Sequence, residues 1–267
     1  MKSVSAIIPS YCGEKLLQKN LPAVLACLRT GDEIVIIDDA SPKNSGLSWL
    51  DEEFRKEAKL KKINLKIIKN TSNLRYAASV NKAVENSKNE LLFLLNNDVS
   101  PEPDCLRFLL DSFANEEVFA VACLEKDNSG QISGKNKLWF AKGLFVHSKA
   151  DDFKSGPTAW ATGGSMLCDK NKWQQLGGFD LHFYPAYWED IDLSFRAKKR
   201  GWQVLFEEQA VVRHQHESSN QDAFGQKQIT AMSWRNAQKF TLKNSNWWQR
   251  IAFFLWLPYW IFKRIRV

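Results

Sequence analysis

The chain has 267 residues, 44% of them hydrophobic and 12% aromatic, which excludes a disordered protein, a disulfide-stapled miniprotein and a collagen-like fibre. Its 37 basic and 30 acidic residues give a net charge of +7, and residues 223–267 hold eight Lys or Arg and no Asp or Glu. Residues 1–222 therefore have a net charge of −1, so the body is nearly neutral and the C-terminal tail supplies the whole excess.

Short apolar runs alternate with patterns of helical period over the first 125 residues. We predict strands at 4–8, 33–37, 63–68, 91–95 and 118–123, and helices at 16–28, 49–60, 77–86 and after Pro101. Strands separated by helices of this length are typical of βαβ units, so the sequence predicts an α/β fold with a mostly parallel sheet covered on both faces. Residues 126–158, rich in Lys, Gly, Ser and Asp, are expected to form a loop or an irregular hairpin.

Carboxylates follow the second of these strands, at the edge where such sheets bind ligands. Asp38 and Asp39 could accept hydrogen bonds from a nucleotide base or a ribose hydroxyl. The alternative is a structural role, in which Asp39 or Ser41 caps the N-terminus of a helix.

Asp98 stands in the same position after the fourth strand, preceded by Asn96 and Asn97. It offers oxygen ligands to Mg²⁺ or Mn²⁺, since Mg²⁺ commonly takes one or two protein carboxylates and completes its shell with substrate phosphates. The alternative is a polar turn that opens the next helix.

An acidic cluster, Glu189, Asp190 and Asp192, opens a helix in the second half of the chain. Acidic residues favour a helix N-terminus, which is the structural explanation. Asp192 falls two residues after Asp190 and so points to a different face of the helix, where we expect it to cap the helix or pair with Arg196. Asp190 would then be free to face a cleft as a general base.

His214 and His216 follow an apolar strand at residues 210–212. An H-x-H pattern on a strand points both rings to one face, where they can bind a metal ion. No Cys lies nearby to complete a structural zinc site, and ordinary surface or hydrogen-bonded histidines are the alternative.

The tail combines its cations with five of the eleven Trp of the chain. This mixture around an apolar run is typical of a membrane-interface segment, and nucleic-acid-binding patches rarely contain twelve apolar residues in a row, as 251–262 does. The run is shorter than the roughly 20 residues of a spanning helix, and Pro258 interrupts it. We expect a helical tail (223–267) that binds an anionic membrane surface through residues 245–267, and no nucleic-acid partner; packing on the body or on a second subunit is the alternative.

The cysteines and the N-terminus favour a cytoplasmic protein. The five Cys form no C-x-x-C pair and mostly lie in apolar runs, which suits free thiols in a reducing compartment. The chain begins with a strand-like run and no signal-peptide pattern, so we expect a protein peripheral on the inner face of the membrane. Dinucleotide-binding, P-loop and α/β-hydrolase motifs are absent from the sequence.

Taken in order, several segments resemble the family 2 inverting glycosyltransferases with the GT-A fold, and most of all the rhamnosyltransferase-type enzymes of bacterial surface polysaccharide synthesis. The matching segments are residues 4–11 (VSAIIPSY), 34–41 (IVIIDDAS), 73–81, 91–98 (LLFLLNND), 161–166 (ATGGSM), 176–180 (LGGFD), 188–196 (WEDIDLSFR), Gly201 and His214. Their order and spacing make the resemblance specific. It implies a GT-A domain over residues 1–222, with a Rossmann-like nucleotide-binding sheet.

The resemblance also implies roles for residues at matching positions. The nucleotide sugar would be bound by Pro9, Ser10, Tyr11, Asp38, Asp39, Arg75, Asn97, Asp98, Gly163 and Gly164. Asp190 would be the catalytic base, Trp188 and Glu189 would lie on the acceptor side, and Asp98 and His214 would hold Mg²⁺ or Mn²⁺. The two glycines would let the backbone approach the donor or the acceptor.

Two positions depart from the family pattern. Asn96 stands at the first position of the DxD-type motif, a variant also found in this subgroup, and leaves one carboxylate for the metal. Arg75 stands where the pattern Asn-x-Gly has Gly, and we expect its guanidinium to reach the donor diphosphate; a surface turn is the alternative.

The implied reaction is an inverting transfer from a nucleoside-diphosphate sugar to a hydroxyl of a glycan or lipid-linked acceptor. A divalent ion would stabilise the charge that develops on the diphosphate, and Asp190 would take the hydroxyl proton. A sugar nucleotidyltransferase is one alternative, although residues 11–15 make a poor phosphate loop. A catalytically inactive, membrane-bound nucleotide-sugar-binding scaffold is the other, and the intact Asp98, Asp190 and His214 disfavour it.

Overall fold

The computed structural model describes residues 2–42, 47, 50, 52–214 and 219–265. Its first half consists of β1 (Val4–Ser10), α1 (Glu14–Cys27), β2 (Glu33–Asp38), α2 (Glu52–Leu60), β3 (Asn64–Lys69), α3 (Arg75–Glu85) and β4 (Leu91–Leu95). β1 pairs in parallel with β2 and β4, and β2 pairs in parallel with β3. The predicted succession of βαβ units is therefore confirmed. Residue 49, the predicted start of the second helix, lies outside the described residues.

The second half of the chain is less regular. It contains β5 (Val99–Pro101), α4 (Cys105–Ser112), β6 (Val118–Lys126), β7 (Ile132–Ser133), β8 (Asn136–Ala141), β9 (Leu144–Lys149), β10 (Gly156–Pro157), β11 (Ser165–Asp169), α5 (Lys170–Leu176), a 3₁₀ turn (Leu181–Phe183), α6 (Glu189–Lys199), β12 (Gln203–His214), α7 (Ser219–Asn244) and α8 (Trp247–Ile265). Within the segment that we expected to be a loop or an irregular hairpin, β8 and β9 form a regular antiparallel hairpin.

The main sheet has the strand order β10-β12-β6-β11-β4-β1-β2-β3, with β5 beside β12 and β7 beside β6. β6 and β12 are parallel, but β11 runs antiparallel between β4 and β6. The chain enters β11 from the hairpin segment and not through a crossover helix, which removes the geometric reason for a parallel strand. The sheet is therefore mixed, and its regular parallel part is the half that the sequence predicted.

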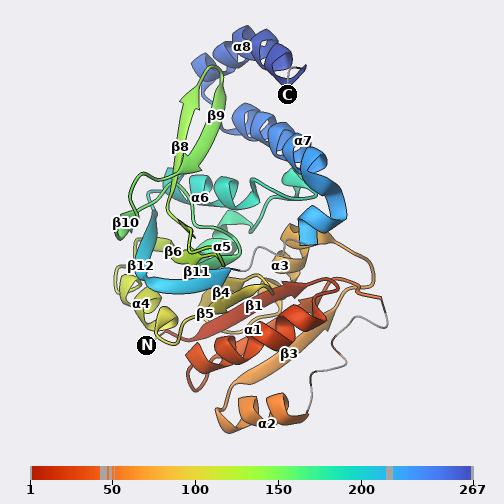
Figure 1. The fold of residues 1–267 in the computed structure, drawn as a ribbon. Coiled ribbons are helices and arrows are strands. Elements are labelled where there is room, and N and C mark those ends of the chain that lie inside the picture. Colours follow the sequence, from red (N-terminus) through yellow and green to blue (C-terminus); the bar gives the residue numbers. More distant parts are fainter. Residues whose placement is uncertain (1, 43–46, 48–49, 51, 215–218, 266–267) are drawn as a thin grey trace.

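Helices cover both faces of this sheet (Figure 1). On one face α1, α2 and α4 bury apolar side chains such as Leu21 and Leu109. On the other face α3, α5 and α6 bury a second set, including Val80 and Leu193. Burial of each large aliphatic side chain contributes about 1.5–3 kcal/mol, so these two clusters hold the strand ends in fixed positions.

A third apolar cluster joins the β8–β9 hairpin to α6 and α7. Phe145, Trp188 and Phe240 are buried in it, and the ring centroids of Phe145 and Phe240 lie 5.3 Å apart. Asn236 of α7 is also buried and donates hydrogen bonds to three carbonyl groups just before α6, those of Phe183, Ala186 and Tyr187. α7 is thus integrated into the body, and the expected boundary between residues 222 and 223 falls inside this helix.

α8 lies at the far end of the hairpin, next to the β8–β9 turn (Figure 1). Phe253 is buried, and Trp260 Nε1 donates a 2.6 Å hydrogen bond to the carbonyl group of Lys142 in that turn. The large apolar side chains that α8 exposes are Trp247, Trp248, Ile251, Phe254, Leu255, Trp256, Tyr259, Ile261 and Phe262. One face of α8 therefore packs on the body and the rest is apolar and exposed. Among the described residues we find no helix with the length and hydropathy needed to cross a bilayer.

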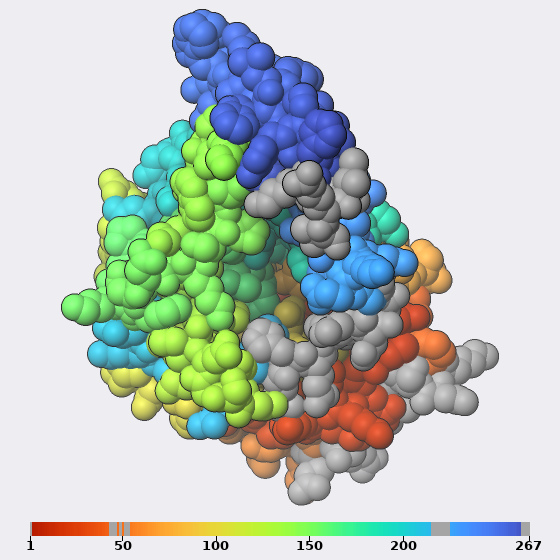
Figure 2. Space-filling view, turned by 45° about the horizontal axis from the view of Figure 1, so that its top comes forward, coloured from red at the N-terminus to blue at the C-terminus, as the bar shows by residue number. Residues whose placement is uncertain are grey.

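Below α8 the surface is hollowed between the hairpin segment, drawn in green, and α7, drawn in blue (Figure 2).

The four buried cysteines, Cys27, Cys105, Cys123 and Cys168, are free thiols, as is the exposed Cys12. This agrees with the expectation that they behave mainly as small apolar side chains.

Candidate active site

Asp39 organises the loop that precedes α3. Its Oδ1 accepts hydrogen bonds from Asn70 Nδ2 (2.8 Å) and the Leu74 N–H (2.7 Å), and its Oδ2 accepts one from the Arg75 N–H (2.8 Å). The carboxylate is buried, so these three donors replace the water that it loses. Asp39 thus caps the N-terminus of α3 through the N–H groups of Leu74 and Arg75, although it lies far from that helix in the sequence; the residue directly before α2 lies outside the described residues.

The other residues expected to bind the nucleotide lie along the same edge of the sheet. Ser10 and Asp38 are partners at the ends of β1 and β2. Ser10 Oγ accepts a hydrogen bond of 3.1 Å from Asn97 Nδ2, which links the ends of β1 and β4. Pro9 is half-buried and Tyr11 is exposed. The fold thus brings these side chains together at the carboxyl ends of parallel strands.

Asp98 and His214 meet where β12 pairs with β5. His214 is the β-ladder partner of Val99, and its Nε2 lies 3.3 Å from Asp98 Oδ1. On the other side of the ring, Nδ1 lies 3.4 Å from Glu125 Oε2. Burial opposes protonation of the ring, but the carboxylates of Asp98 and Glu125 outweigh it and raise the pKa of His214 to about 10. The two carboxylates thus create an environment that favours a cation.

This arrangement fits a divalent metal ion. Asp98 Oδ1 is buried and, apart from the His214 ring at 3.3 Å, has no polar partner among the described residues, so a cation beside it would compensate its charge. Mn²⁺ accepts both carboxylate and imidazole ligands, and Glu125 would orient His214 through Nδ1. The described residues contain no group of three His, Cys, Asp or Glu arranged to hold a metal, so the protein would supply two ligands and the substrate phosphates the others. His216 lies outside the described residues.

Asp190 occupies the first turn of α6. Its Oδ2 accepts a hydrogen bond from the Gly163 N–H (3.1 Å) and its Oδ1 accepts one from the Ile191 N–H (2.8 Å). Burial raises the pKa of Asp190 above its ordinary value, although both N–H groups act in the opposite direction. A carboxylate with a raised pKa is a stronger base than an ordinary aspartate and therefore suits the role of proton acceptor.

Residues 163–165 connect the parts of the site. The Gly163 N–H binds Asp190, the Gly164 carbonyl group accepts a 2.9 Å hydrogen bond from the Asn96 N–H, and Ser165 Oγ donates to Glu125. A Cβ at Gly164 would lie only 2.5 Å from Asn96 Nδ2. The close approach that this glycine permits is thus to the DxD-type segment itself.

The two residues expected on the acceptor side are buried. Glu189 Oε2 has no hydrogen-bond partner in the described part of the chain, and burial, reinforced by the charge of Asp190, raises the pKa of Glu189 to about 8. Burial thus favours the protonated form of Glu189 beside Asp190. Trp188 is 3% exposed and donates its Nε1–H to Ser233 Oγ (3.3 Å), so its ring supports the site from behind.

Asp192 has the structural role that the sequence predicted. Arg196 Nε lies 2.6 Å from its Oδ2, which confirms the expected pair. Lys243 Nζ lies 2.8 Å from its Oδ1, so the fully buried Asp192 also ties α6 to α7. Asp190 thus contacts the segment at Gly163, whereas Asp192 contacts Arg196 and Lys243.

Arg75 adopts a positive φ of 69°. This backbone conformation favours glycine, which gives a physical reason for the glycine of the family pattern. Its N–H binds both Asp39 and Asn73 Oδ1, and its side chain is half-buried. A contact between its guanidinium and a diphosphate stays a prediction.

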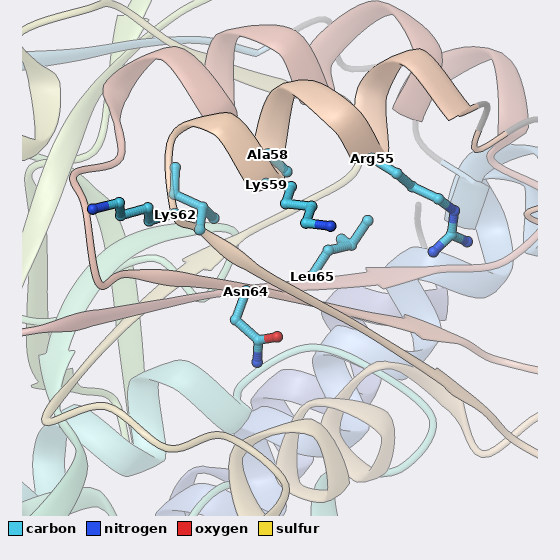
Figure 3. Close-up of a pocket in the computed structure, with 7 residues that line it drawn as sticks. Arg55, Ala58, Lys59, Lys62, Asn64 and Leu65 are labelled. Carbon is cyan, nitrogen blue, oxygen red and sulfur yellow. The ribbon is translucent and has the colours of Figure 1, made fainter.

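A separate basic cavity of about 390 Å³ lies between α2 and the start of β3, lined by residues that include Arg55, Lys59, Lys62 and Asn64 (Figure 3). It borders the amino-terminal end of that strand, whereas the residues described above lie at carboxyl ends. It is therefore not part of the candidate active site.

Residues 5–174 match the family described as "Glycosyl transferase family 2", and residues 91–264 match "Glycosyl transferase family group 2". The first match alone spans more than half of the chain. The chain belongs to glycosyl transferase family 2.

Curated relatives place this glycosyltransferase near the rhamnosyltransferases. It is 25% identical over 228 residues to the O-antigen chain rhamnosyltransferase RfbN of Salmonella typhimurium, an alignment that covers 83% of this chain and 69% of the relative. A stretch of 67 residues is 34% identical to the N-acetylglucosaminyl-diphospho-decaprenol L-rhamnosyltransferase of Mycobacterium tuberculosis and covers 25% of this chain and 22% of the relative. The predicted resemblance to a rhamnosyltransferase-like subgroup of this family is thereby confirmed.

Solved structures share the fold of the transferase. GalNAc-T7 with UDP, GalNAc and Mn²⁺ has a TM-score of 0.64 at 16% identity, with 82% of this chain and 45% of the other covered. The mannosyltransferase of Pyrobaculum calidifontis with GDP-Man and Mn²⁺ has a TM-score of 0.59 at 16% identity, with 96% and 74% covered. Our chain thus spans less than half of GalNAc-T7, and identity this low shows the fold alone.

The sequence did not point us to three side chains of the transferase site. Glu125 contacts His214 and Ser165; Tyr76 donates a 2.7 Å hydrogen bond to the Gly163 carbonyl group; and Asn70 binds Asp39. The signal that singled out Asp38 and Asp98, a carboxylate directly after a buried strand, also applies to Glu125. Tyr76 lies in the matching segment 73–81 but was given no role there, and nothing in the local pattern marks Asn70.

Proposed function

We propose that the transferase moves a sugar from a nucleoside-diphosphate sugar to a hydroxyl of a glycan or lipid-linked acceptor in bacterial surface polysaccharide synthesis, with inversion at the anomeric carbon. The observation that carries this proposal is the short segment 163–165. This segment forms hydrogen bonds with Asp190, with the DxD-type segment and with Glu125, the carboxylate next to His214 Nδ1. A base and a candidate metal pair are thereby held together at the ligand-binding edge of the sheet.

The donor end of the site supports a nucleotide sugar. Ser10, Asp38 and Asn97 line the edge next to Asp98, where a nucleoside diphosphate can lie along the strand ends. The neighbouring folds were solved with UDP or GDP-Man, and the curated relatives are rhamnosyltransferases. We therefore propose a nucleoside-diphosphate deoxyhexose or hexose as the donor.

The chemistry follows from where charge develops. As the bond between the anomeric carbon and the diphosphate oxygen breaks, that oxygen keeps the electron pair, and the acceptor oxygen forms the new bond on the opposite face. Mg²⁺ or Mn²⁺, held by Asp98 and His214, would stabilise the charge of the departing diphosphate. Asp190 takes the proton of the attacking hydroxyl, which contributes roughly 10²–10⁴-fold to the rate. A single displacement inverts the configuration.

The exposed face of α8 supports peripheral attachment to the inner face of the cell membrane. Leu255 is 76% exposed and Phe254 is 63% exposed, values that are unfavourable in water for side chains of this size. The last helix also carries Arg250, Lys263 and Arg264, and Trp with cations around an apolar face is typical of a helix that lies in the headgroup region. Such attachment would keep the site near a lipid-linked acceptor.

A donor screen tests the proposed activity. Purified transferase with Mn²⁺ or Mg²⁺ is incubated with a panel of nucleotide sugars, including a nucleoside-diphosphate rhamnose, and released nucleoside diphosphate is measured with and without a glycan acceptor. We expect one donor class to be preferred and the product to show inverted anomeric configuration by NMR. Release of pyrophosphate from a nucleoside triphosphate and a sugar phosphate would instead identify a nucleotidyltransferase.

A further inference from the structure

A groove of about 520 Å³ lies between α7 and the segment that leads into α6. Pro185 forms one wall, and Met232, Trp234 and Arg235 of α7 form the other. The groove is separate from the strand ends that hold Asp98 and His214. Its lining combines apolar and aromatic surface with a guanidinium and two amide side chains, those of Gln228 and Gln238.

Arg235 lines the groove, and Lys239 follows one helical turn further along α7, just outside that lining. Arg235 Nη2 donates a 3.0 Å hydrogen bond to the Tyr184 carbonyl group, and Lys239 Nζ donates one of 2.6 Å to the His182 carbonyl group. Neither has an ion-pair partner in the described ranges, whereas Lys243, the next cation along the helix, pairs with Asp180 and Asp192. Burial and the charge of Arg235 lower the pKa of Lys239. The charge of Asp180 opposes this lowering, but Asp180 is already paired with Lys243, so within the described ranges neither Arg235 nor Lys239 has a counter-charge of its own.

An anion with several oxygens would supply that charge. A guanidinium has five N–H groups, so its bond to the Tyr184 carbonyl group leaves others for a phosphate oxygen. No Asp or Glu occurs from residue 223 to the end of the chain, so neither α7 beyond that point nor α8 offers an internal partner. A diphosphate carries several charges and can contact cations on two neighbouring helical turns, whereas a single carboxylate carries one charge.

The neighbours of the groove indicate which other chemical groups such a ligand carries beside its diphosphate. At one end, the Trp234 ring lies 5.2 Å from the Trp260 ring of α8, which connects the groove to the exposed apolar face. Pro185, in the other wall, precedes Asp190 by five residues, so at most about 18 Å of chain separates them. A ligand that occupies the groove can thus extend toward the apolar helix on one side and the catalytic carboxylate on the other.

We propose that this groove binds the diphosphate of a lipid-linked acceptor. The lipid chain leaves past Trp234 along α8, Arg235 and Lys239 bind the diphosphate oxygens, and the sugar is directed to Asp190. The inference rests on the proposed transfer to a lipid-linked acceptor and adds the site that recognises it. A free nucleotide or an inorganic diphosphate would match the cations but not the apolar end.

Binding of a short prenyl diphosphate tests the groove without any sugar transfer. Farnesyl diphosphate is titrated into the full-length transferase in mild detergent by calorimetry, with farnesol and inorganic pyrophosphate as the two halves of the ligand. Arg235→Gln and Lys239→Gln remove one charge each and keep an amide N–H for the carbonyl partner. Lys227→Gln removes a charge from the same helix two turns before Arg235, on the far side from Lys239, and is the matched control.

We expect farnesyl diphosphate to bind at least ten-fold more tightly than either half, and each groove variant to weaken it roughly ten-fold, with Lys227→Gln unchanged. Ala231→Trp, which fills the groove and leaves both cations in place, should also abolish binding and covers the case in which a cation variant fails to fold. Wild-type affinity in the cation variants and in Ala231→Trp, or equal affinity for farnesol, overturns the proposal. Since no donor is present, a failure of the proposed glycosyl transfer would appear in the donor screen and not here.

Discussion

The Gly163 N–H donates a hydrogen bond to Asp190 Oδ2 across 3.1 Å and so joins the segment before β11 to the first turn of α6. The carbonyl group of the same glycine accepts a hydrogen bond from Tyr76, whose chain neighbour Arg75 binds Asp39 through its N–H. The candidate base and the loop expected to bind the nucleotide are therefore connected through the hydrogen bonds of Gly163, Tyr76 and Arg75. Because the atoms that react must be placed within a fraction of an ångström, this connection is expected to matter for the rate.

Asp190→Asn should lower acceptor-dependent turnover by roughly two orders of magnitude or more, because the amide keeps the shape and the bond from Gly163 but cannot take a proton. Donor affinity, measured by calorimetry, should stay near the wild-type value. Asp192→Asn is the matched control. It should lower the thermal midpoint through the loss of its pairs with Arg196 and Lys243, and it should affect turnover of the folded protein much less. The reverse pattern would assign the base to Asp192.

Glu189→Gln should change how stability depends on pH. Burial raises the pKa of Glu189 from its ordinary value of 4.5 to about 8, so between these values the folded protein keeps a proton that the unfolded chain releases. Stability is therefore full below about pH 4.5 and falls as the pH rises toward 8, by an amount on the order of a few kcal/mol. In denaturant titrations from pH 5 to 8, the free energy of unfolding of Glu189→Gln should therefore not show this decrease. Glu116→Gln, at an exposed site, should follow the wild type, and parallel curves for all three proteins would contradict the prediction.

Metal removal should stop the reaction. Asp98 alone cannot neutralise a departing diphosphate, so excess EDTA should abolish turnover, and added Mg²⁺ or Mn²⁺ should restore it. His214→Ala should lower the maximal activity and raise the Mn²⁺ concentration at which the enzyme reaches half of its maximal activity. Glu125→Gln, which removes the charge behind the ring, should raise that concentration roughly 10–100-fold. His216→Ala should do less than His214→Ala, and full activity in EDTA would refute the metal assignment.

The sequence predicted the parallel half of the sheet because strand and helix periods there are regular and each strand end carries its own polar signal. It also predicted the pair of Asp192 with Arg196, since a spacing of four residues along a helix fixes that geometry. It could not predict that β11 inserts antiparallel between β4 and β6, because strand order depends on contacts between segments far apart in the chain.

The same limit applies to the candidate site. Asp39 caps α3, a helix that lies well beyond it in sequence, and Glu125 reaches His214 only because β6 and β12 are neighbours. The burial of Trp188 also follows from a partner, α7, that the sequence pattern assigned to the tail. Local pattern identifies a reactive residue type, but which partner it meets is decided by the tertiary fold.

Arg75→Gly separates the backbone role of this position from its charge. Glycine adopts the observed positive φ without steric cost and loses more chain entropy on folding, so the free energy of unfolding should change by no more than about 1 kcal/mol. If the guanidinium binds the donor diphosphate, the loss of charge-assisted hydrogen bonds should raise the dissociation constant for the donor about ten-fold or more. Arg75→Lys should restore part of the affinity. Unchanged donor affinity in Arg75→Gly would leave the residue with a turn role only.

Truncation after Asn244 should release the transferase from membranes while leaving its body folded. The cut removes α8, with its exposed apolar face, and keeps α7, whose Phe240 and Asn236 belong to the body. Each cation near an anionic surface contributes about 1 kcal/mol, so the full chain should float with anionic vesicles and less so at high salt, and the truncated chain should not float. Turnover of a soluble acceptor should survive the cut, whereas use of a lipid-linked acceptor should be lost. If the full chain instead ignores vesicles and sediments as a dimer that the cut converts to a monomer, the exposed face of α8 is covered by a second subunit and not by lipid.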